Sequence, residues 1–314
     1  MGARPTRRTP GAALLATVAL VIAPLSACSS AATTAAAWPC GTHRTVQYAS
    51  YPGVDPNQTS LDVYMPAAGD RGCSGRAIVV WVHGGGWGGG DKAEFMEHKI
   101  PLFTGAGYVF ASVNYRVTNK EAVPPSPRYP VHDQDTADAV AWLVHHAGEF
   151  GGDAKRVAVL GHSAGGGIVA AIATDGRYLG KDGLQLSSVV CAASMDGEGY
   201  DVTAGATTAE PPEWRTVYTD AFGTDPTVWA DASPINHVAA GKGIPRYFIA
   251  ARGSDWRTAQ HNAFIAALQA AGVPTTVLDA SELEHADLTT LVGAPGDTKV
   301  TPALMDFLGG CFKG

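Results

Sequence analysis

The sequence predicts an α/β fold with a mostly parallel sheet that helices cover on both faces. Strand-like runs alternate with helical runs along most of the chain, which is the pattern of parallel strands joined by helices. The run at residues 77–82 is wholly apolar, as expected of a strand buried on both faces. No repeat of fixed period interrupts the pattern, so we expect one domain over residues 41–314.

The strands are expected in short runs of apolar and β-branched residues at 45–48, 61–65, 77–82, 108–115, 156–160, 189–194, 246–251 and 275–278. Helical spacing of the apolar residues predicts helices at 92–103, 134–150, 168–173, 258–271 and 302–308. Residues 119–130 contain four prolines and are expected to form a loop.

The first 27 residues have the three parts of a secretory signal peptide. Arginines come first, an apolar run follows at 11–25, and Leu-Ser-Ala-Cys ends the segment. The ending resembles the bacterial lipobox, so we expect lipid attachment at Cys28 and a tether over residues 28–40. The alternative is an ordinary signal peptide with a cysteine there by chance. Either way we expect an exported protein, lipid-anchored to the outer face of the plasma membrane in the bacterial cell envelope, or secreted.

The composition is that of a globular protein, with 46% hydrophobic and 16% charged residues. Removing the three signal arginines leaves 19 basic residues against 29 acidic ones, a net charge of −10. Such a domain is a poor partner for nucleic acid or for anionic lipid, so we expect membrane contact only through the lipid anchor. No CxxC motif or His/Cys cluster predicts a metal or cofactor.

Four cysteines remain if Cys28 is lipidated, and an even number in an exported protein predicts disulfides. Three pairings are open. We favour Cys40–Cys73 with Cys191–Cys311, because the first pair would join the start of one strand to the loop after the next. These two strands are neighbours if they are antiparallel.

Gly161-His162-Ser163-Ala164-Gly165 fits the G-x-S-x-G pattern of a nucleophile elbow. A buried strand precedes it and a helix of small residues follows, as such a turn requires. A second motif, His83-Gly84-Gly85-Gly86-Trp87, follows the strand at 77–82. Its glycines would let backbone N–H groups face a substrate, as an oxyanion hole needs.

These two motifs, with Asn114-Tyr115-Arg116 between them, resemble those of α/β-hydrolase carboxylesterases over about residues 60–307. The resemblance is to hormone-sensitive-lipase-like esterases and to ferulic and acetyl esterases that act on plant polysaccharides. It implies the α/β-hydrolase fold, a small carboxylic ester as substrate, and oxyanion amides from Gly85, Gly86 and Ala164. It also implies a triad acid after the next-to-last strand and a histidine after the last.

Ser163 therefore needs two partners from the end of the chain. His285 follows the strand at 275–278 and is the expected general base. Asp255 follows the strand at 246–251 and is the acid we favour. Asp196, which follows the strand at 189–194, is the alternative, because some members of the fold place their acid there.

Residues 197–238 are the expected lid and contain Trp214, Tyr218, Phe222 and Trp229. A short lid predicts an open site and a short acyl group. The aromatic residues would stack on a sugar or phenolic acid of an acylated carbohydrate, or simply pack the loop.

Two other functions stay open. One is cleavage of another acyl compound such as a formamide, because arylformamidases share a His-Gly-Gly-x-Trp motif. The other is a catalytically inactive cell-surface binding protein of the same fold. Asp133, Asp135 and Asp138 have a spacing that invites a metal interpretation. We expect them instead at the solvent-facing start of a helix, where acids favour the dipole.

Overall fold

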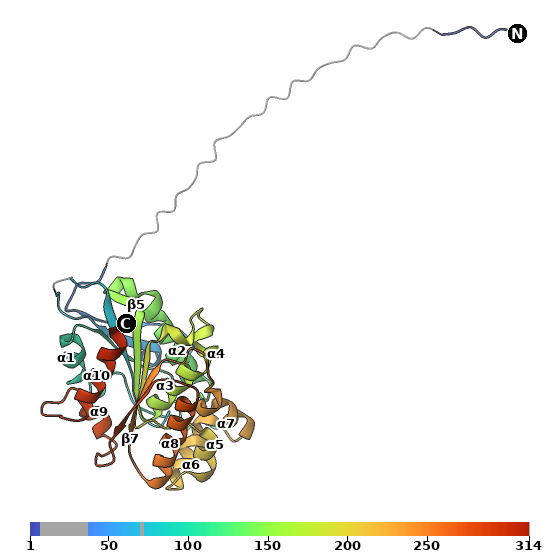
Figure 1. The fold of residues 1–314 in the computed structure, drawn as a ribbon. Helices are drawn as coiled ribbons and strands as arrows, with labels where there is room; N and C mark the ends of the chain where they lie inside the picture. The colour runs from blue at the N-terminus through green and yellow to red at the C-terminus, as the bar shows by residue number, and fades with distance from the viewer. Residues whose placement is uncertain (7–36, 70–71, 314) are drawn as a thin grey trace. The chain divides into compact units, whose positions relative to one another are not determined.

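The computed structural model describes residues 1–6, 37–69 and 72–313. A sheet of eight strands in the order β1-β2-β4-β3-β5-β6-β7-β8 forms its centre (Figure 1). The strand β2 is antiparallel to both its neighbours, and every other pair is parallel. The predicted fold class is confirmed.

The strands lie close to the expected runs. Their bounds are β1 His43–Gln47, β2 Ser60–Tyr64, β3 Arg76–Val82, β4 Val109–Val113, β5 Gly152–His162, β6 Cys191–Met195, β7 Arg246–Ala251 and β8 Thr275–Asp279. The central strand β3 is buried along nearly its whole length, which explains its unbroken apolar sequence.

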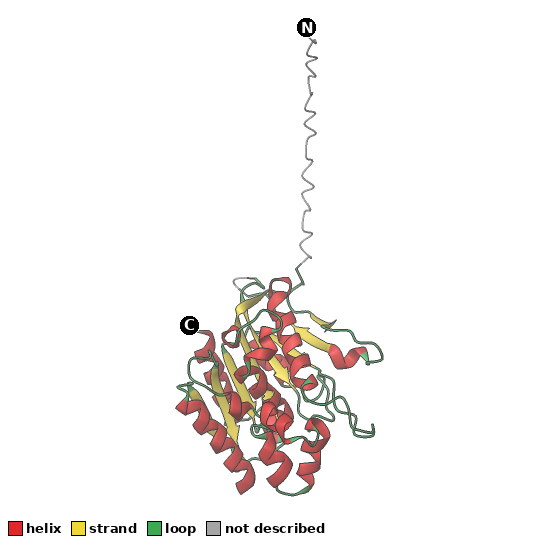
Figure 2. Cartoon of the chain, turned by 90° about the vertical axis from the view of Figure 1, so that its right-hand side faces the viewer, coloured by secondary structure: helices red, strands yellow, loops and turns green. Residues whose placement is uncertain are grey.

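Helices cover both faces of the sheet, as Figures 1 and 2 show. One face carries α1 Lys99–Gly105, α9 Asp287–Thr290 and α10 Val300–Phe312. The other carries α2 Val131–His145, α3 Ala164–Thr174, α4 Gly176–Gly180 and α8 Asp255–Ala270. Three further helices form the segment expected as a lid: α5 Val202–Thr208, α6 Glu213–Phe222 and α7 Pro226–Ala232. We call residues 197–238 the cap. The helix at 134–150 ends early, since Ala147–Phe150 is a separate 3-10 turn.

The helix expected at 92–103 is wrong for its first half, because α1 begins only at Lys99. Side chains hold residues 91–93 in a turn instead. The Asp91 carboxylate accepts the Ala93 N–H at 2.9 Å, and the Asn114 side chain accepts the Lys92 N–H at 2.6 Å. Local side-chain bonds of this kind offer the backbone an alternative to a helix.

Both favoured disulfides are confirmed. Cys40–Cys73 and Cys191–Cys311 are bonded, with Cα–Cα distances of 5.6 and 6.1 Å. Trp38 is buried against Phe150, with ring centroids 5.7 Å apart, so packing reaches back into the segment assigned to the tether. Residues 28–36 of that tether, which include Cys28, and most of the signal segment lie outside the described residues.

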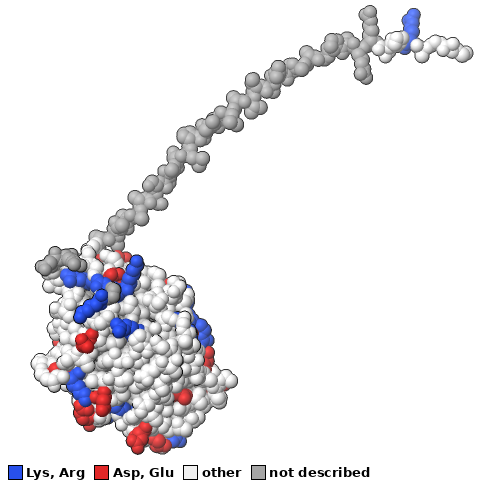
Figure 3. All heavy atoms as spheres, in the orientation of Figure 1, with Lys and Arg blue, Asp and Glu red and all other residues white. Residues whose placement is uncertain are grey.

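Within residues 1–6, 37–69 and 72–313 no helix is both long and apolar enough to cross a bilayer. On the face drawn in Figure 3, charged side chains stand in small groups around a wide uncharged area.

Candidate active site

The nucleophile elbow forms where β5 passes into α3. Ser163 lies between them with φ 54° and ψ −124°, a conformation that side-chain-bearing residues rarely adopt. Packing holds this turn. A Cβ on Gly161 would overlap the carbonyl of Gly165, and one on Gly165 would overlap that of His83. Gly161 is therefore needed for the turn itself, and Gly165 for the close approach of the turn to the loop that begins at His83.

The second motif forms a loop beside Ser163. A Cβ on Gly84 would lie 3.0 Å from the Cβ of Ser163, a tighter contact than nearly all real ones, so the glycine favours this close approach of the backbone. Gly85 and Gly86 have φ of 117° and 58°. In the described part of the chain neither donates its N–H to a backbone carbonyl. Ala164 opens α3, so its N–H has no helical partner either. Gly85 and Gly86 line the same cavity as Ser163, and Ala164 follows it, so the three predicted amides belong to residues beside the nucleophile.

The third motif, Asn114-Tyr115-Arg116, supports these loops and does not line the cavity. The hydroxyl of Tyr115 donates to the carbonyl of His83 at 3.1 Å, and the two rings stack 4.4 Å apart. Arg116 makes a two-point ion pair with the buried Asp135 of α2. The motif that carried part of the resemblance is therefore structural.

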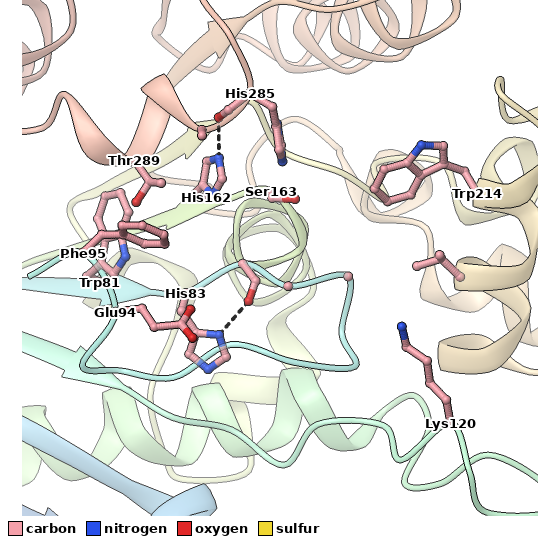
Figure 4. Close-up of a pocket in the computed structure, with 15 residues that line it drawn as sticks. Trp81, His83, Glu94, Phe95, Lys120, His162, Ser163, Trp214, His285 and Thr289 are labelled. Atoms are coloured by element: carbon pink, nitrogen blue, oxygen red, sulfur yellow. Dashed lines mark hydrogen bonds between the residues drawn. The ribbon is translucent and has the colours of Figure 1, made fainter.

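His285 lies in the loop between β8 and α9, and Figure 4 shows its ring pointing toward Ser163. Its Nδ1 lies 2.5 Å from Oδ2 of Asp196, which follows β6. Since a carboxylate can only accept, Nδ1 carries the proton and Nε2 is left as a base. The structure thus brings His285 to Asp196, the alternative acid.

The favoured acid, Asp255, is the wrong residue for this contact. It is the first residue of α8 and is exposed at the helix N-terminus, which Ser254 caps. The end of β7 instead brings Arg257, from the first turn of α8, to the place where an acid was expected. Asp196 reaches His285 because its backbone turns sharply after β6, with φ 48°.

Arg257 and Glu198 are functional candidates that the sequence did not single out. The guanidinium donates from Nε to Oδ1 of Asp196 at 2.6 Å and from Nη2 to its backbone carbonyl at 2.9 Å. It also forms an ion pair with the buried Glu198. Burial would raise the pKa of Asp196, but the hydrogen bond from His285 and the charge of Arg257 outweigh it and lower that pKa to about 2.

His162 fixes His285 from the other side. Its Nε2 donates to the backbone carbonyl of His285 at 2.9 Å, and the rings lie 4.6 Å apart. Burial and the neighbouring His285 charge lower the pKa of His162 to about 3, so its ring is neutral. The elbow residue before the nucleophile therefore positions the base.

A cavity of about 410 Å³ opens over Ser163 (Figure 4). The glycine loop, His285 and the cap residues Trp214 and Val217 form its walls, and Trp81 and Phe95 add apolar surface. The other predicted cap aromatics pack elsewhere. Tyr218 and Phe222 are buried against the ring of Trp87, with centroids 5.2 and 5.0 Å away.

The three aspartates of α2 are structural, and the expectation that they face solvent is wrong for two of them. Asp133 and Asp135 are buried, the latter paired with Arg116. Asp133 accepts a hydrogen bond from Tyr178 at 3.3 Å, and burial raises its pKa to about 8. Asp138, on the same helix, pairs with Lys181.

This geometry suits nucleophilic attack on a carbonyl carbon. A hydroxyl on a strained turn faces an imidazole whose tautomer a carboxylate fixes, and free backbone N–H groups stand beside it.

A family model, that of BD-FAE, matches residues 61–257, which is more than half of the chain. The chain belongs to the BD-FAE family. The match includes Ser163, the glycine loop, Asp196 and Arg257, and it ends before His285.

Several known esterases are similar in sequence to part of this chain. Carboxylesterase NlhH of Mycobacterium tuberculosis is 38% identical over 105 residues, covering 33% of this chain and 30% of its own. Ethyl acetate hydrolase of Pseudomonas putida is 32% identical over 119 residues, covering 38% and 35%. The chain thus matches about a third of these relatives. A hyperthermophilic esterase of Pyrobaculum calidifontis shares the fold, with TM-score 0.68 and 18% identity over 88% of this chain and 86% of its own.

Proposed function

We propose that the protein is a serine carboxylesterase that cleaves small esters with short acyl groups. The contact that carries the proposal is the 2.5 Å hydrogen bond between His285 and Asp196, beside a serine held on a strained elbow. It completes a base of the correct tautomer at a site where three amides have no backbone partner in the described part of the chain. Membership of the BD-FAE family and the partial likeness to esterases support it.

In the proposed reaction Oγ of Ser163 attacks the ester carbonyl while Nε2 of His285 takes its proton. Asp196 stabilises the imidazolium that forms. The N–H groups of Gly85, Gly86 and Ala164 stabilise the oxyanion of the tetrahedral intermediate. His285 then protonates the leaving alcohol, and an acyl group stays on Ser163. Water, activated by His285, releases the acid and restores the enzyme.

The cavity supports a short acyl group. Its volume of about 410 Å³ must hold both the acyl and the alcohol parts, and the cap closes one side. The name of the Pseudomonas putida relative describes an enzyme for ethyl acetate, an ester with two carbons on each side. Trp214 at the wall would stack on a sugar or phenolic ring, so an acylated carbohydrate belongs among the substrates to test.

Hydrolysis of p-nitrophenyl acetate, butyrate and decanoate tests this proposal, with acetylated xyloside and methyl ferulate beside them. We expect activity on the short esters that is lost at least about 10³-fold in Ser163→Ala. Ser187→Ala, at an exposed turn, is the matched control. A folded protein that cleaves no ester would contradict the proposal. Cleavage of N-formylkynurenine would then indicate a formamidase, and failure to react with a fluorophosphonate would indicate a binding protein.

We also propose export and lipid attachment at Cys28. The arginine-rich start, the apolar run and Leu-Ser-Ala-Cys support both. In a bacterial host, labelled palmitate should enter the wild-type chain and be absent from Cys28→Ala. Label that persists in Cys28→Ala would contradict attachment there.

A further inference from the structure

The triad acid of the proposed esterase has a cationic neighbour that the mechanism does not use. Arg257 contacts the Asp196 carboxylate and backbone, and its Nη2 also lies 3.3 Å from Nδ1 of His285. When Nδ1 donates to Asp196, both of these nitrogens carry protons, so this close contact is not a hydrogen bond. A positive charge at that distance opposes the imidazolium that acylation requires.

We propose that Arg257 and Glu198 act as a charge-compensated pair that positions Asp196 and sets the proton affinity of the proposed catalytic base. Arg257 fixes the carboxylate so that Oδ2 faces His285. Glu198 neutralises Arg257, so the cation can hold the acid without weakening the base. The inference rests on the proposed function and adds two positioning residues to it.

Geometry supports the positioning role. The two bonds from Arg257 reach both ends of the same residue, Oδ1 of the side chain and the backbone carbonyl of Asp196. These two hydrogen bonds leave the Asp196 side chain little freedom to rotate away from His285. Its side chain is fully buried, so water cannot replace the guanidinium.

Glu198 is equally well fixed. Its side chain is 5% exposed, and one oxygen pairs with Arg257. The other oxygen accepts from the hydroxyl of Tyr218, in the cap, at 3.1 Å. Its backbone N–H donates to the carbonyl of Ser163 at 3.0 Å. The compensating charge is thus tied to the nucleophile's own turn and to the cap.

Other charged and titratable groups surround the pair, from the strand ends, the elbow, α8 and the cap: Arg252, His162, His261, Glu284, Tyr200 and Tyr218. His261 lies 3.6 Å from Asp196, and burial lowers its pKa to about 4, so it is neutral at working pH. Arg252 lies 3.4 Å from Asp196 and 4.0 Å from Glu284. These groups stay unchanged in the variants below, so shifts between variants report the pair itself.

The test is a double-mutant cycle read by pH profiles of kcat/KM. Even with the full screening of water, at a dielectric constant of about 80, a unit charge this close changes a proton equilibrium about tenfold. In Glu198→Gln the uncompensated Arg257 should move the midpoint of the acid limb down by about one pH unit and lower kcat about tenfold. In Arg257→Met the uncompensated Glu198 should move the midpoint up by a similar amount.

The double variant separates charge from positioning. Its midpoint should return to within about 0.3 pH units of wild type, because both charges are gone. Its kcat should stay at least about tenfold low, because Asp196 is no longer held. Glu198→Asp, which keeps the charge, should stay nearer the wild-type midpoint than Glu198→Gln. Glu149→Gln, at a partly exposed site in the 3-10 turn before β5, is the control for loss of one negative charge.

Single variants that leave both the midpoint and kcat unchanged would overturn the inference. If Arg257→Met does not fold, the two Glu198 variants carry the test alone. The pH dependence of fluorophosphonate labelling at Ser163, with an NMR titration of the His285 ring, gives the same midpoint without an ester substrate. Absence of labelling in the wild type would contradict the proposed function. Labelling with an unmoved midpoint in Glu198→Gln would contradict only the inference.

Discussion

Two aspartates of this molecule are buried to a similar degree, but their pKa values are shifted in opposite directions. Asp196, after β6, has its pKa lowered to about 2. Asp133, in the first turn of α2, has its pKa raised to about 8. Both are at most 5% exposed.

The opposite pKa shifts come from the hydrogen-bond and charged partners of the two carboxylates. Asp196 receives hydrogen bonds from a guanidinium and an imidazole, so its charged form is favoured in spite of burial. Asp133 receives one from the hydroxyl of Tyr178 and faces the negative Asp175. Burial raises a carboxyl pKa unless a cation opposes it. The guanidinium and the imidazole therefore keep Asp196 charged in spite of its burial, and the contrast with Asp133 makes the assignment of Asp196 testable.

The largest expected effect comes from removing the charge of Asp196. Asp196→Asn should lower kcat about 10³- to 10⁴-fold, because the imidazolium loses its stabilising carboxylate and the base its tautomer. Steady-state hydrolysis of p-nitrophenyl acetate measures this. Asp255→Asn is the matched control and should stay within about twofold of wild type, because that side chain is exposed at the start of α8. Equal losses of kcat in both variants would contradict the assignment of Asp196, rather than Asp255, as the triad acid.

A smaller effect should follow from moving the acid without altering it. A Cβ on Gly167 would overlap the carbonyl oxygen of Glu198, so Gly167→Ala should displace the loop after β6. We expect kcat to fall about 10²-fold, since displacements near 1 Å cost that much in an aligned site. Gly176→Ala, where a Cβ would meet Leu186 at an ordinary 3.9 Å, should leave kcat near wild type. Full activity in Gly167→Ala would show that the loop tolerates the shift.

The smallest effect should be on stability, at Asp133. A carboxyl whose pKa is raised on folding stabilises the fold below its unfolded pKa, and that contribution is lost as pH rises through the folded value. The window here runs from about pH 4 to about pH 8. Asp133→Asn should therefore gain roughly 1–3 kcal/mol over wild type at pH 8 and little at pH 4. Urea unfolding at both pH values measures it, and a pH-independent difference would contradict the assignment.

The sequence predicted what depends on local geometry. Ser163 and the glycines are recognisable because a strained turn and a close backbone approach admit few residue types. Both disulfides followed from strand order and elimination. The cap helices were missed, although Asp201 and Asp225 cap α5 and α7 with their side chains and gave a readable signal.

The acid could not be chosen from the sequence. The strands β6 and β7 are parallel neighbours, so both end at the edge where His285 lies. Which one supplies the carboxylate depends on the backbone turn at Asp196 and on the side chains of α8, and strand order decides neither. Arg257 and Glu198 carried no local motif, because their roles arise only from a contact between residues 59 apart in sequence.

The packing of Trp87 has a consequence for how esters reach Ser163. This residue of the oxyanion loop packs against both Tyr218 and Phe222 of the cap, and Tyr218 also donates a hydrogen bond to Glu198. The cap and the catalytic loops therefore share one core and cannot separate without exposing it. A lipase whose lid opens at an oil–water interface needs the opposite arrangement. Rates of the proposed esterase should follow a simple hyperbola in dissolved substrate, with no sudden increase when the ester passes its solubility limit.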